Sequence, residues 1–487
     1  MEAGHDIYVE EILTKALCAA HAMEKLDQDQ TDKIVRSIYE IGFMNRWILA
    51  DMAFRETGVG NVHDKMIKNI IATRFVYRDI ALQRTVGIIN EDKENQIIEI
   101  ARPMGPVFAV TPVTNPTSTA LFKILIAMKS RNPLIIYPHG AARKCTSEAA
   151  RLCYEAARDA GAPENCIQWI PRLTREQVLR LMGHKRMALV LATGSVSLVK
   201  AAYSSGTPAI GVGPGNVPVY IGKSADVPFA VNQILLSKLF DNGTICASEQ
   251  AVVVSQNNAD AVRKEFIRQG GYFLSPQQMQ KVGKIAFNTT QHSMSPDVIG
   301  KPALAIAGMA GIRVPHGTRC LIAPMENSQV GPDWPLSLEI LAPILAFYEV
   351  AGFEEGIAQC RRINEHGGLG HTVSIFSNDD EKIRYFAQSL NAGRIVVNTP
   401  SSQGALGGLY NGLTPSLTLA CGSGGKNFTT DNISVKHLLN IQRIAYRKIS
   451  LCAEHQEGTA FCCDQHLTLS EIDEKCDKNR KENALKN

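Results

Sequence analysis

The segment Pro106-Val107-Phe108-Ala109-Val110 is the first of four short apolar runs that decide the fold. The other three follow at residues 133–137 (PLIIY), 187–191 (MALVL) and 209–213 (AIGVG). Stretches with helical character separate these runs, among them Ala141 to Ala160 and Arg175 to Gly183. This alternation is typical of an α/β sheet whose parallel strands are covered by helices on both faces.

The chain outside this stretch has further patterns. A second α/β set is expected from about Asp241 to Leu419, with strands at Ala251 to Ser255 and Arg394 to Asn398. On the amino-terminal side, apolar residues recur at helical spacing, as in Asp32 to Ala50. Between residues 84 and 102, two apolar runs flank a charged segment, which predicts a β-hairpin.

The composition is that of an ordinary globular enzyme. Of the 487 residues, 45% are hydrophobic and 20% are charged, and the formal net charge is +4. This balance gives no reason to expect a nucleic-acid or membrane partner, and no apolar run approaches the roughly 20 residues that cross a bilayer. The acidic start, Met1 to Glu11, does not resemble a secretory signal, and the twelve scattered cysteines fit reduced thiols. We therefore expect a cytoplasmic protein.

Residues 450–487 form a tail of different composition. Its cysteines and histidines precede a lysine-rich end, and they are Cys452, His455, Cys462, Cys463, His466 and Cys476. Their spacings fit no standard zinc pattern, so no metal site is predicted. We expect a mobile or docking tail. Within it, Leu467 to Lys475 is a candidate amphipathic helix for binding a neighbouring subunit or the shell of a microcompartment.

Three candidate ligand-binding loops follow expected strands of the first set. They are residues 111–116 (TPVTNP), 192–195 (ATGS) and 211–216 (GVGPGN). Open α/β sheets bind ligands at the carboxyl ends of their strands, and a glycine followed by a helix start suits a phosphate. Because the full dinucleotide fingerprint is absent, plain connecting loops and tight turns stay open as the alternative.

Two further loops carry reactive side chains. Cys246 lies in the polar loop 240–250 (FDNGTICASEQ), immediately before an expected strand, where glycine and polar neighbours suit an accessible nucleophile. His371 lies in the glycine-rich stretch 367–372 (GGLGHT), from which a histidine can reach a site. The alternatives are an inert buried cysteine and a structural histidine.

These residues together carry a family resemblance. The motifs are NPTST (115–119), KAAYSSG (200–206), DNG (241–243), ICASEQ (245–250) and KHLLN (436–440). Over about residues 10 to 447 the chain resembles the CoA-acylating aldehyde dehydrogenases. It is most similar to the aldehyde dehydrogenase half of bifunctional aldehyde–alcohol dehydrogenases, and to stand-alone relatives that act on acetaldehyde, sulfoacetaldehyde or succinate semialdehyde. We expect the iron-dependent alcohol dehydrogenase half to be absent.

The resemblance implies an aldehyde dehydrogenase fold. Such a fold has a Rossmann-like cofactor domain, an α/β catalytic domain and a small oligomerisation hairpin. The implied parts are a dinucleotide-binding domain (1–240, with the hairpin at 84–102), a catalytic domain (241–429), an oligomerisation segment (430–449) and the tail (450–487). The resemblance also implies a homodimer or homotetramer.

The resemblance further implies a role for each candidate site residue. Cys246 would be the nucleophile that forms a thiohemiacetal and then a thioester, and Asn115 would donate to the oxyanion. His371 would assist thioester transfer rather than hydride transfer. Glu339 would hold the nicotinamide ribose. The remaining implied cofactor-binding residues are Val110, Thr111, Pro112, Val113, Thr114, Asn115, Ser195, Gly213 and Gly424, the last in the carboxyl-terminal active-site loop.

The acyl acceptor separates two activities. More distant, hydrolytic aldehyde dehydrogenases carry a glutamate that activates water in the stretch equivalent to 211–216, and this chain has no acid there. We therefore predict coenzyme A as the acceptor, in a reversible NAD(P)-dependent oxidation of a short-chain aldehyde to acyl-CoA. The alternatives are a hydrolytic enzyme that releases the free acid and a binding protein that keeps the fold without the activity.

Two specificities stay open in the sequence. In the loop 421–427 (CGSGGKN), Gly424 stands where the related bifunctional enzymes have tryptophan, and Lys426 adds a cation. Acetaldehyde and a small anionic aldehyde such as sulfoacetaldehyde therefore both remain, with Lys426 facing either the pocket or solvent and CoA phosphate. Arg143 and Lys144 follow the second expected strand and are candidates to pair with a 2′-phosphate. NAD is the expected cofactor, with NADP as the alternative.

Overall fold

The structure is a computed structural model that describes residues 2–288, 293–447, 468, 470–471 and 474. The chain divides into two compact units. The first comprises Met1–Gln83 and Pro103–Leu438, and the second comprises Arg84–Arg102 and Leu439–Asn487. Every candidate site residue belongs to the first unit.

Helices occupy the amino-terminal part of the first unit, as the apolar spacing predicts. They are α1 (Glu2–Met23), α2 (Gln28–Met44), α3 (Arg46–Thr57), α4 (Val62–Ile70), the π-helical turn η1 (Ile71–Phe75) and α5 (Val76–Ile80). The stretch from Asp32 to Ala50 is two helices and not one. The break falls at Asn45, which leaves the helical conformation (φ −90°, ψ 9°) and donates from its side-chain amide to the carbonyl of Ile41.

The predicted first sheet is present, and all of its strand pairs are parallel. Its order is β5-β4-β3-β6-β7, with β3 (Val107–Val110), β4 (Leu134–Tyr137), β5 (Ile167–Trp169), β6 (Leu189–Thr193) and β7 (Ala209–Val212). The connecting helices are α6 (Pro116–Lys129), η2 (Gly140–Ala142), α7 (Arg143–Asp159), α8 (Arg175–Met182) and α9 (Val196–Tyr203). The four apolar runs and both named helices are therefore confirmed to within two residues.

A second sheet of seven parallel strands follows in the same unit, in the order β10-β13-β14-β9-β8-β15-β16. Its strands are β8 (Val217–Ile221), β9 (Glu249–Ser255), β10 (Gly271–Phe273), β13 (Cys320–Met325), β14 (Ile344–Val350), β15 (Gly370–Phe376) and β16 (Ala392–Val397). The strands expected at 251–255 and 394–398 are confirmed. This sheet includes β8, which precedes the expected domain start at 241, because the chain leaves the first sheet through the turn at 213–216.

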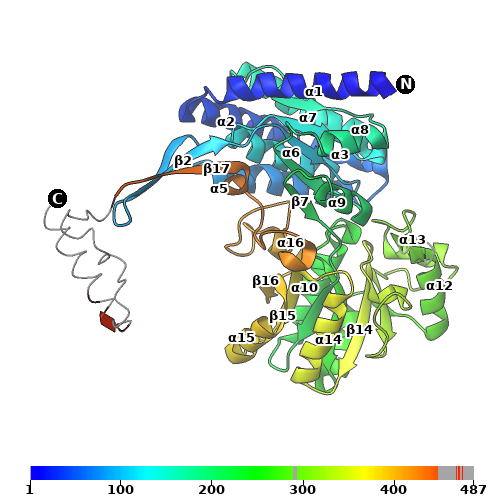
Figure 1. Ribbon diagram of the computed structural model, residues 1–487. Coiled ribbons are helices and arrows are strands. Elements are labelled where there is room, and N and C mark those ends of the chain that lie inside the picture. The colour runs from blue at the N-terminus through cyan, green and yellow to red at the C-terminus, as the bar shows by residue number, and fades with distance from the viewer. Residues whose placement is uncertain (1, 289–292, 448–467, 469, 472–473, 475–487) are drawn as a thin grey trace. The chain divides into compact units, whose positions relative to one another are not determined.

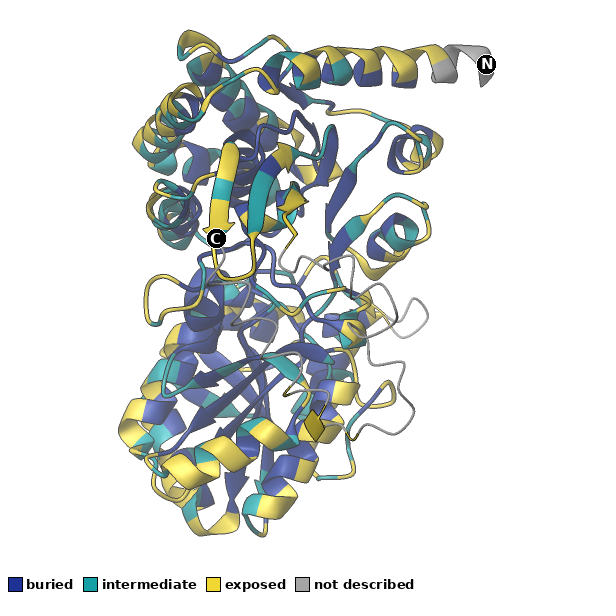
Figure 2. Ribbon diagram, turned by 60° about the vertical axis from the view of Figure 1, so that its left-hand side comes forward, coloured by how far each residue is buried: buried dark blue, intermediate teal, exposed yellow. Residues whose placement is uncertain are grey.

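Helices cover both faces of the second sheet (Figure 1). On one face, α10 (Val227–Leu239) and α11 (Gln256–Arg268) pack against Val252 and Phe347. On the other, α12 (Pro276–Ala286), α13 (Ala303–Met309), α14 (Phe353–Glu365) and α15 (Asp380–Ser389) pack around Val253 and Tyr348. Adjacent residues of β9 thus point to opposite faces, and all of β9 and β15 is buried, as the dark blue interior of Figure 2 shows.

The remaining elements of the first unit are short. They are η3 (Phe240–Gly243), the antiparallel pair β11 (Phe287–Asn288) and β12 (Ser293–Met294), η4 (Pro335–Ser337), α16 (Ser401–Leu406), η5 (Ser423–Gly425) and η6 (Val435–Leu438). Among the described residues, no helix combines the length and apolar character that a membrane span requires.

The second unit contains the predicted hairpin. Strands β1 (Gly87–Asp92) and β2 (Ile97–Pro103) pair antiparallel, and β17 (Leu439–Ala445) lies on the other side of β2. The cysteines and histidines of the tail lie outside the described residues, as does most of the candidate helix from Leu467 to Lys475.

Candidate active site

Cys246, the candidate nucleophile, lies in the polar turn between η3 and β9. His371 is the second residue of β15, and only β8 separates β15 from β9 in the sheet. Nε2 of His371 lies 3.2 Å from Sγ of Cys246. The two reactive side chains, which the sequence places in separate loops, therefore form a hydrogen-bonded pair at the amino ends of the second sheet.

Burial keeps this pair uncharged. Cys246 is partly exposed as a residue, but burial raises the pKa of its thiol to about 12, and the charge of Glu339 raises it too, while Arg394 opposes both. Burial, followed by the charge of Arg394, lowers the pKa of His371 to about 3. The pair is therefore a neutral thiol beside a neutral imidazole, and an unprotonated Nε2 of His371 can accept a hydrogen bond from the thiol.

The far side of His371 is held by a buried arginine. Nδ1 of His371 lies 2.9 Å from Oγ1 of Thr372, and Nε of Arg394 donates to the same oxygen at 3.2 Å. With its proton on Nδ1, His371 donates to Thr372 and leaves Nε2 to accept from the thiol. The other acceptors of Arg394 are also uncharged: His371 O, Ala420 O, Thr430 O and Asn432 Oδ1. The guanidinium thus places a positive charge beside the pair.

The glycine-rich stretch 211–216 contacts the same pair. A Cβ on Gly215 would lie 2.2 Å from the carbonyl oxygen of Cys246 and 3.2 Å from Cδ2 of His371. The amide of Gly215 donates to Oε1 of Glu339 at 2.9 Å. Burial raises the pKa of Glu339 to about 7, although this hydrogen bond lowers it. Position 215 therefore requires glycine, because its backbone approaches that of Cys246 closely. Through Gly215, the stretch 211–216 connects Glu339 to the Cys246–His371 pair.

Asn115, the candidate oxyanion donor, is the N-cap residue of α6. Its amide oxygen accepts from Nζ of Lys68 at 2.6 Å, and its amide nitrogen donates to Oγ1 of Thr114 at 3.2 Å. Nζ of Lys68 also donates to Oγ1 of Thr244 at 2.8 Å, two residues before Cys246. Lys68 thereby joins the loop after β3 to the loop before β9. The rest of the loop after β3 consists of Thr111, Pro112 and Val113, which follow Val110 at the strand end.

The carboxyl ends of β3, β6 and β7 form the candidate dinucleotide site. Because β6 lies between β3 and β7, Thr111, Thr193 and Gly213 lie along one edge. The buried hydroxyls of Thr111 and Thr193 lack a partner in the described part of the chain, and a Cβ on Gly213 would meet nothing within 4 Å. Ser195 caps α9 and accepts from the amide of Leu198. Unpaired hydroxyls, a helix start and open space fit a dinucleotide.

Gly424 lies in η5 and approaches the loop that carries His371. A Cβ on Gly424 would lie 2.9 Å from Cγ of Leu369 and 3.0 Å from its carbonyl oxygen. Asn427 is buried and donates to the carbonyl of Gly211 at 3.0 Å. Between them, Lys426 has a left-handed backbone (φ 64°) and an exposed side chain. The carboxyl-terminal loop therefore packs against both the glycine-rich stretch and the histidine loop, with Lys426 on its exposed side.

Sequence reasoning missed the charged residues that support these groups. Lys65, Lys68 and Arg394 belong to residue types that are usually exposed, yet each is buried here. Asp241, which Lys65 and Lys68 contact, stands out in the sequence only as part of the DNG motif. The available signal was the three-residue spacing of the two lysines in a helix, which is more typical of a solvated face. In the described ranges, no cluster of three or more His, Cys, Asp or Glu side chains would hold a metal ion.

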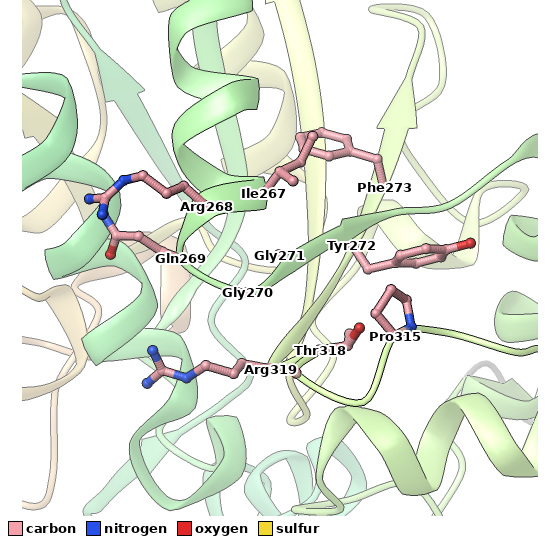
Figure 3. A pocket seen from close by; sticks show the side chains of 11 residues that line it. Ile267, Arg268, Gln269, Gly270, Gly271, Tyr272, Phe273, Pro315, Thr318 and Arg319 are labelled. Carbon is pink, nitrogen blue, oxygen red and sulfur yellow. The ribbon is translucent and has the colours of Figure 1, made fainter.

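A separate surface pocket opens beside β10, the edge strand of the second sheet (Figure 3). Its lining residues are 267–273, Pro315, Gly317, Thr318 and Arg319. None of the candidate site residues lies among them. The candidate active site is therefore the Cys246–His371 pair and not this pocket.

Comparisons with known proteins show which family the chain resembles along most of its length. A profile described as the aldehyde dehydrogenase family matches residues 1–418. The bifunctional aldehyde-alcohol dehydrogenase of Escherichia coli K12 is 43% identical over 424 residues, which cover 86% of this chain and 47% of that protein. The succinate-semialdehyde dehydrogenase (acetylating) of Clostridium kluyveri is 34% identical over 444 residues, which cover 91% of this chain and 96% of that protein. The crystal structure of an acetylating aldehyde dehydrogenase from Geobacillus thermoglucosidasius matches with a TM-score of 0.89 and 46% identity, covering 92% of this chain and 98% of that chain.

The two parallel sheets and the thiol–imidazole pair fit the class of oxidoreductases that act through a cysteine. The chain belongs to the aldehyde dehydrogenase family. It spans about half the length of the bifunctional relatives that it matches.

Proposed function

We propose that this chain is a CoA-acylating aldehyde dehydrogenase, which reversibly oxidises a short-chain aldehyde to its acyl-CoA thioester with NAD(P)+. The observation that carries the proposal is the 3.2 Å contact between Nε2 of His371 and Sγ of Cys246, beside a loop (211–216) that offers no carboxylate. The names of similar proteins support it, since the Clostridium kluyveri relative and the Geobacillus structure are both called acetylating.

In the proposed first step, Sγ of Cys246 attacks the aldehyde carbon while Nε2 of His371 takes the thiol proton. The charge of Arg394 favours the sulfur as it becomes negative, and the free N–H of Asn115 donates to the aldehyde oxygen. When bound, the dinucleotide supplies the hydride acceptor, and a thioester remains on Cys246. The residues that would hold the dinucleotide are Thr111, Ser195, Gly213 and Glu339.

The surroundings of that thioester favour a thiol as the acceptor. Gly215 brings a backbone, and not a carboxylate, against the carbonyl of Cys246. The carboxylate of Glu339 is engaged by the amide of Gly215. Once His371 has released the proton of Cys246, the CoA thiol can give its own proton to His371 far more readily than water can, because thiols ionise at about pH 8.5 and bulk water has a pKa of about 15.7. Hydrolysis to the free acid is the slower alternative.

We propose NAD as the preferred dinucleotide. Helix α7 begins after β4, where the adenosine ribose lies in sheets of this type. At this helix start, the carboxylate of Glu56 accepts from the amides of Lys144 at 2.8 Å and Cys145 at 2.7 Å. A carboxylate there suits ribose hydroxyls and repels a 2′-phosphate, although the side chains of Arg143 and Lys144 would attract one. A higher kcat/KM with NAD than with NADP is expected, and the reverse order would contradict this choice.

For the aldehyde, we propose a short chain and include a small anionic one because of Lys426. The test is kcat/KM for acetaldehyde, sulfoacetaldehyde and succinate semialdehyde in the wild type and in Lys426→Met. If Lys426 recognises the anion, the variant loses turnover of the two anionic aldehydes and keeps that of acetaldehyde. An equal change with all three aldehydes would instead assign Lys426 to solvent or to CoA.

The activity itself is tested by following reduction of NAD in the presence and absence of CoA. The expected result is turnover that requires CoA and disappears in Cys246→Ala. Equal turnover without CoA, with release of the free acid, would return the chain to the hydrolytic class. No turnover of any aldehyde by a folded protein would favour a binding protein that keeps the fold.

We propose that the second unit mediates a homodimer or homotetramer. Strands β1 and β17 are the outer strands of its sheet, and β17 is largely exposed. Open strand edges pair readily with another chain. Light scattering should give the mass of a dimer or tetramer, and deletion of residues 84–102 should lower it. We also propose that the protein is cytoplasmic and that its tail docks to a microcompartment.

A further inference from the structure

Helix α4 carries two buried lysines, Lys65 and Lys68, which lie three residues apart and therefore share one face. Lysine rarely lies inside a protein without a partner, yet Lys65 is 2% exposed and Lys68 is 1% exposed. Both contact the same carboxylate oxygen, Oδ2 of Asp241, at 3.0 Å and 2.5 Å. The nearby Asp64 accepts instead from the side chain of Asn61 and the amide of Asp241. Two cations therefore share one carboxylate, although one would neutralise it.

The second cation has further partners. Besides Asp241, Nζ of Lys68 donates to Oδ1 of Asn115 at 2.6 Å and to Oγ1 of Thr244 at 2.8 Å. An ammonium group has three donors and no acceptor, so all three N–H bonds are used, and the atom of Asn115 that it touches must be the amide oxygen. The amide nitrogen is thereby turned away from Lys68. One of its N–H bonds contacts Thr114, and the other has no partner among the described residues.

A cation on the oxygen of an amide also changes its nitrogen. It draws electron density from the nitrogen, so the N–H bonds become stronger donors. Burial lowers the pKa of Lys68 to about 8, with Asp241 opposing, so the group still carries its charge near neutral pH. We propose that Lys68 is a positioning residue that turns the Asn115 amide toward the oxyanion on Cys246 and strengthens it as a donor. This inference rests on the proposed function.

Lys65 separates this role from a purely structural one. Its Nζ contacts Asp241 and the backbone carbonyl of Thr114, but not the side chain of Asn115. If Lys68 is replaced, Asp241 still accepts from Lys65, from Thr244 and from the amide of Asn61. The loop before Cys246 therefore keeps these hydrogen bonds, and the replacement of Lys68 mainly affects the side-chain amide of Asn115. Lys65→Met is the matched control, because it removes a buried cation from the same carboxylate on the same helix.

The experiment measures CoA-dependent turnover in Lys68→Met, Lys65→Met, Asn115→Ala and the double variant Lys68→Met/Asn115→Ala. Loss of an oxyanion donor generally costs about 10²–10³-fold in kcat, so loss of its orientation and polarisation should cost about 10–10²-fold. The KM for NAD should change little. In the Asn115→Ala background, Lys68→Met should have no further effect, because the amide on which it acts is gone. Lys65→Met should lower kcat far less than Lys68→Met.

A second readout isolates the oxyanion. Alkylation of Cys246 by iodoacetamide forms no oxyanion, so its rate should be the same in wild type and Lys68→Met. Three results would each overturn the inference. They are an equal loss of turnover in Lys65→Met and Lys68→Met, multiplicative losses of turnover in the double variant, and slower alkylation of Cys246 in Lys68→Met. If Lys68→Met does not fold, Lys68→Gln keeps a neutral donor and should give an intermediate kcat, whereas a wild-type kcat would contradict the role of charge. Lack of CoA-dependent turnover in the wild type would instead reject the proposed function.

Discussion

Substitution of Gly215 by alanine tests the close approach at the centre of the site. The added Cβ would lie 2.2 Å from the carbonyl oxygen of Cys246, and real Cβ contacts below 3.0 Å essentially never occur. One of the two backbones must therefore move by about 0.8 Å, the difference between these distances. The φ angle of Gly215 lies outside the left-handed region, and its amide is retained, so the effect is steric. A misplacement of about 1 Å costs about 100-fold in rate, or about 2.7 kcal/mol.

The assay compares kcat for CoA-dependent oxidation and the thermal midpoint in Gly215→Ala and in Gly412→Ala. Gly412 is the matched control, because a Cβ there would meet nothing within 4 Å. Gly215→Ala should lower kcat about 100-fold and destabilise the fold by about 1–3 kcal/mol, whereas the control should change neither. If the two variants have equal kcat and equal midpoints, the backbones around Cys246 are not in contact as described, and the reasoning is refuted.

Three further changes probe the charges and protons of the site. Arg394→Met removes the cation that favours ionised Cys246, so the pH of half-maximal iodoacetamide alkylation should rise, and an unchanged profile would show that this charge has no influence. His371→Ala removes the base for the thiol proton, so single-turnover hydride transfer should slow by about 10²–10⁴-fold, and a wild-type rate would exclude that role. Glu249 is buried with its pKa raised from 4.5 to about 7, so the folded state keeps a proton that the unfolded state has lost. The free energy of unfolding should therefore fall as pH rises from about 4.5 to about 7. In Glu249→Gln this fall should be smaller, and the free energy of unfolding at pH 8 should exceed that of the wild type by about 1–3 kcal/mol, as measured by denaturant titration.

The sheets could be predicted because their signal is local. Every residue of β3 is apolar and buried on both sides, as a central strand of a covered parallel sheet requires. The hairpin of β1 and β2 was predicted for a related reason, since a charged turn separates two runs of strand-forming residues. The membership of β8 in the second sheet depends instead on tertiary contacts, which outweigh local propensity. The break at Asn45 depends on its side-chain hydrogen bond to the carbonyl of Ile41, which an apolar spacing does not reveal.

The individual residues of the candidate site could be named from the sequence, but the contacts between them could not. Cys246 and His371 are 125 residues apart, and the order of the second sheet, in which only β8 separates β9 from β15, brings them together. Lys68 lies 173 residues from Asp241, and its burial depends on partners that no sequence window contains. Arg394 was visible only as part of an expected strand. Long-range contacts of charged side chains therefore account for most of what sequence patterns left out.

The central claim is that CoA, and not water, releases the acyl group from the thioester on Cys246. Measuring the mass of the protein during a single turnover tests this claim most directly. The enzyme is mixed with aldehyde and NAD without CoA, and the acyl adduct on Cys246 is followed in time before and after CoA is added. The account predicts an adduct that persists without CoA and is released as acyl-CoA when CoA is added, and no adduct in Cys246→Ala. An adduct that decays to the free acid at the same rate with and without CoA would contradict the account.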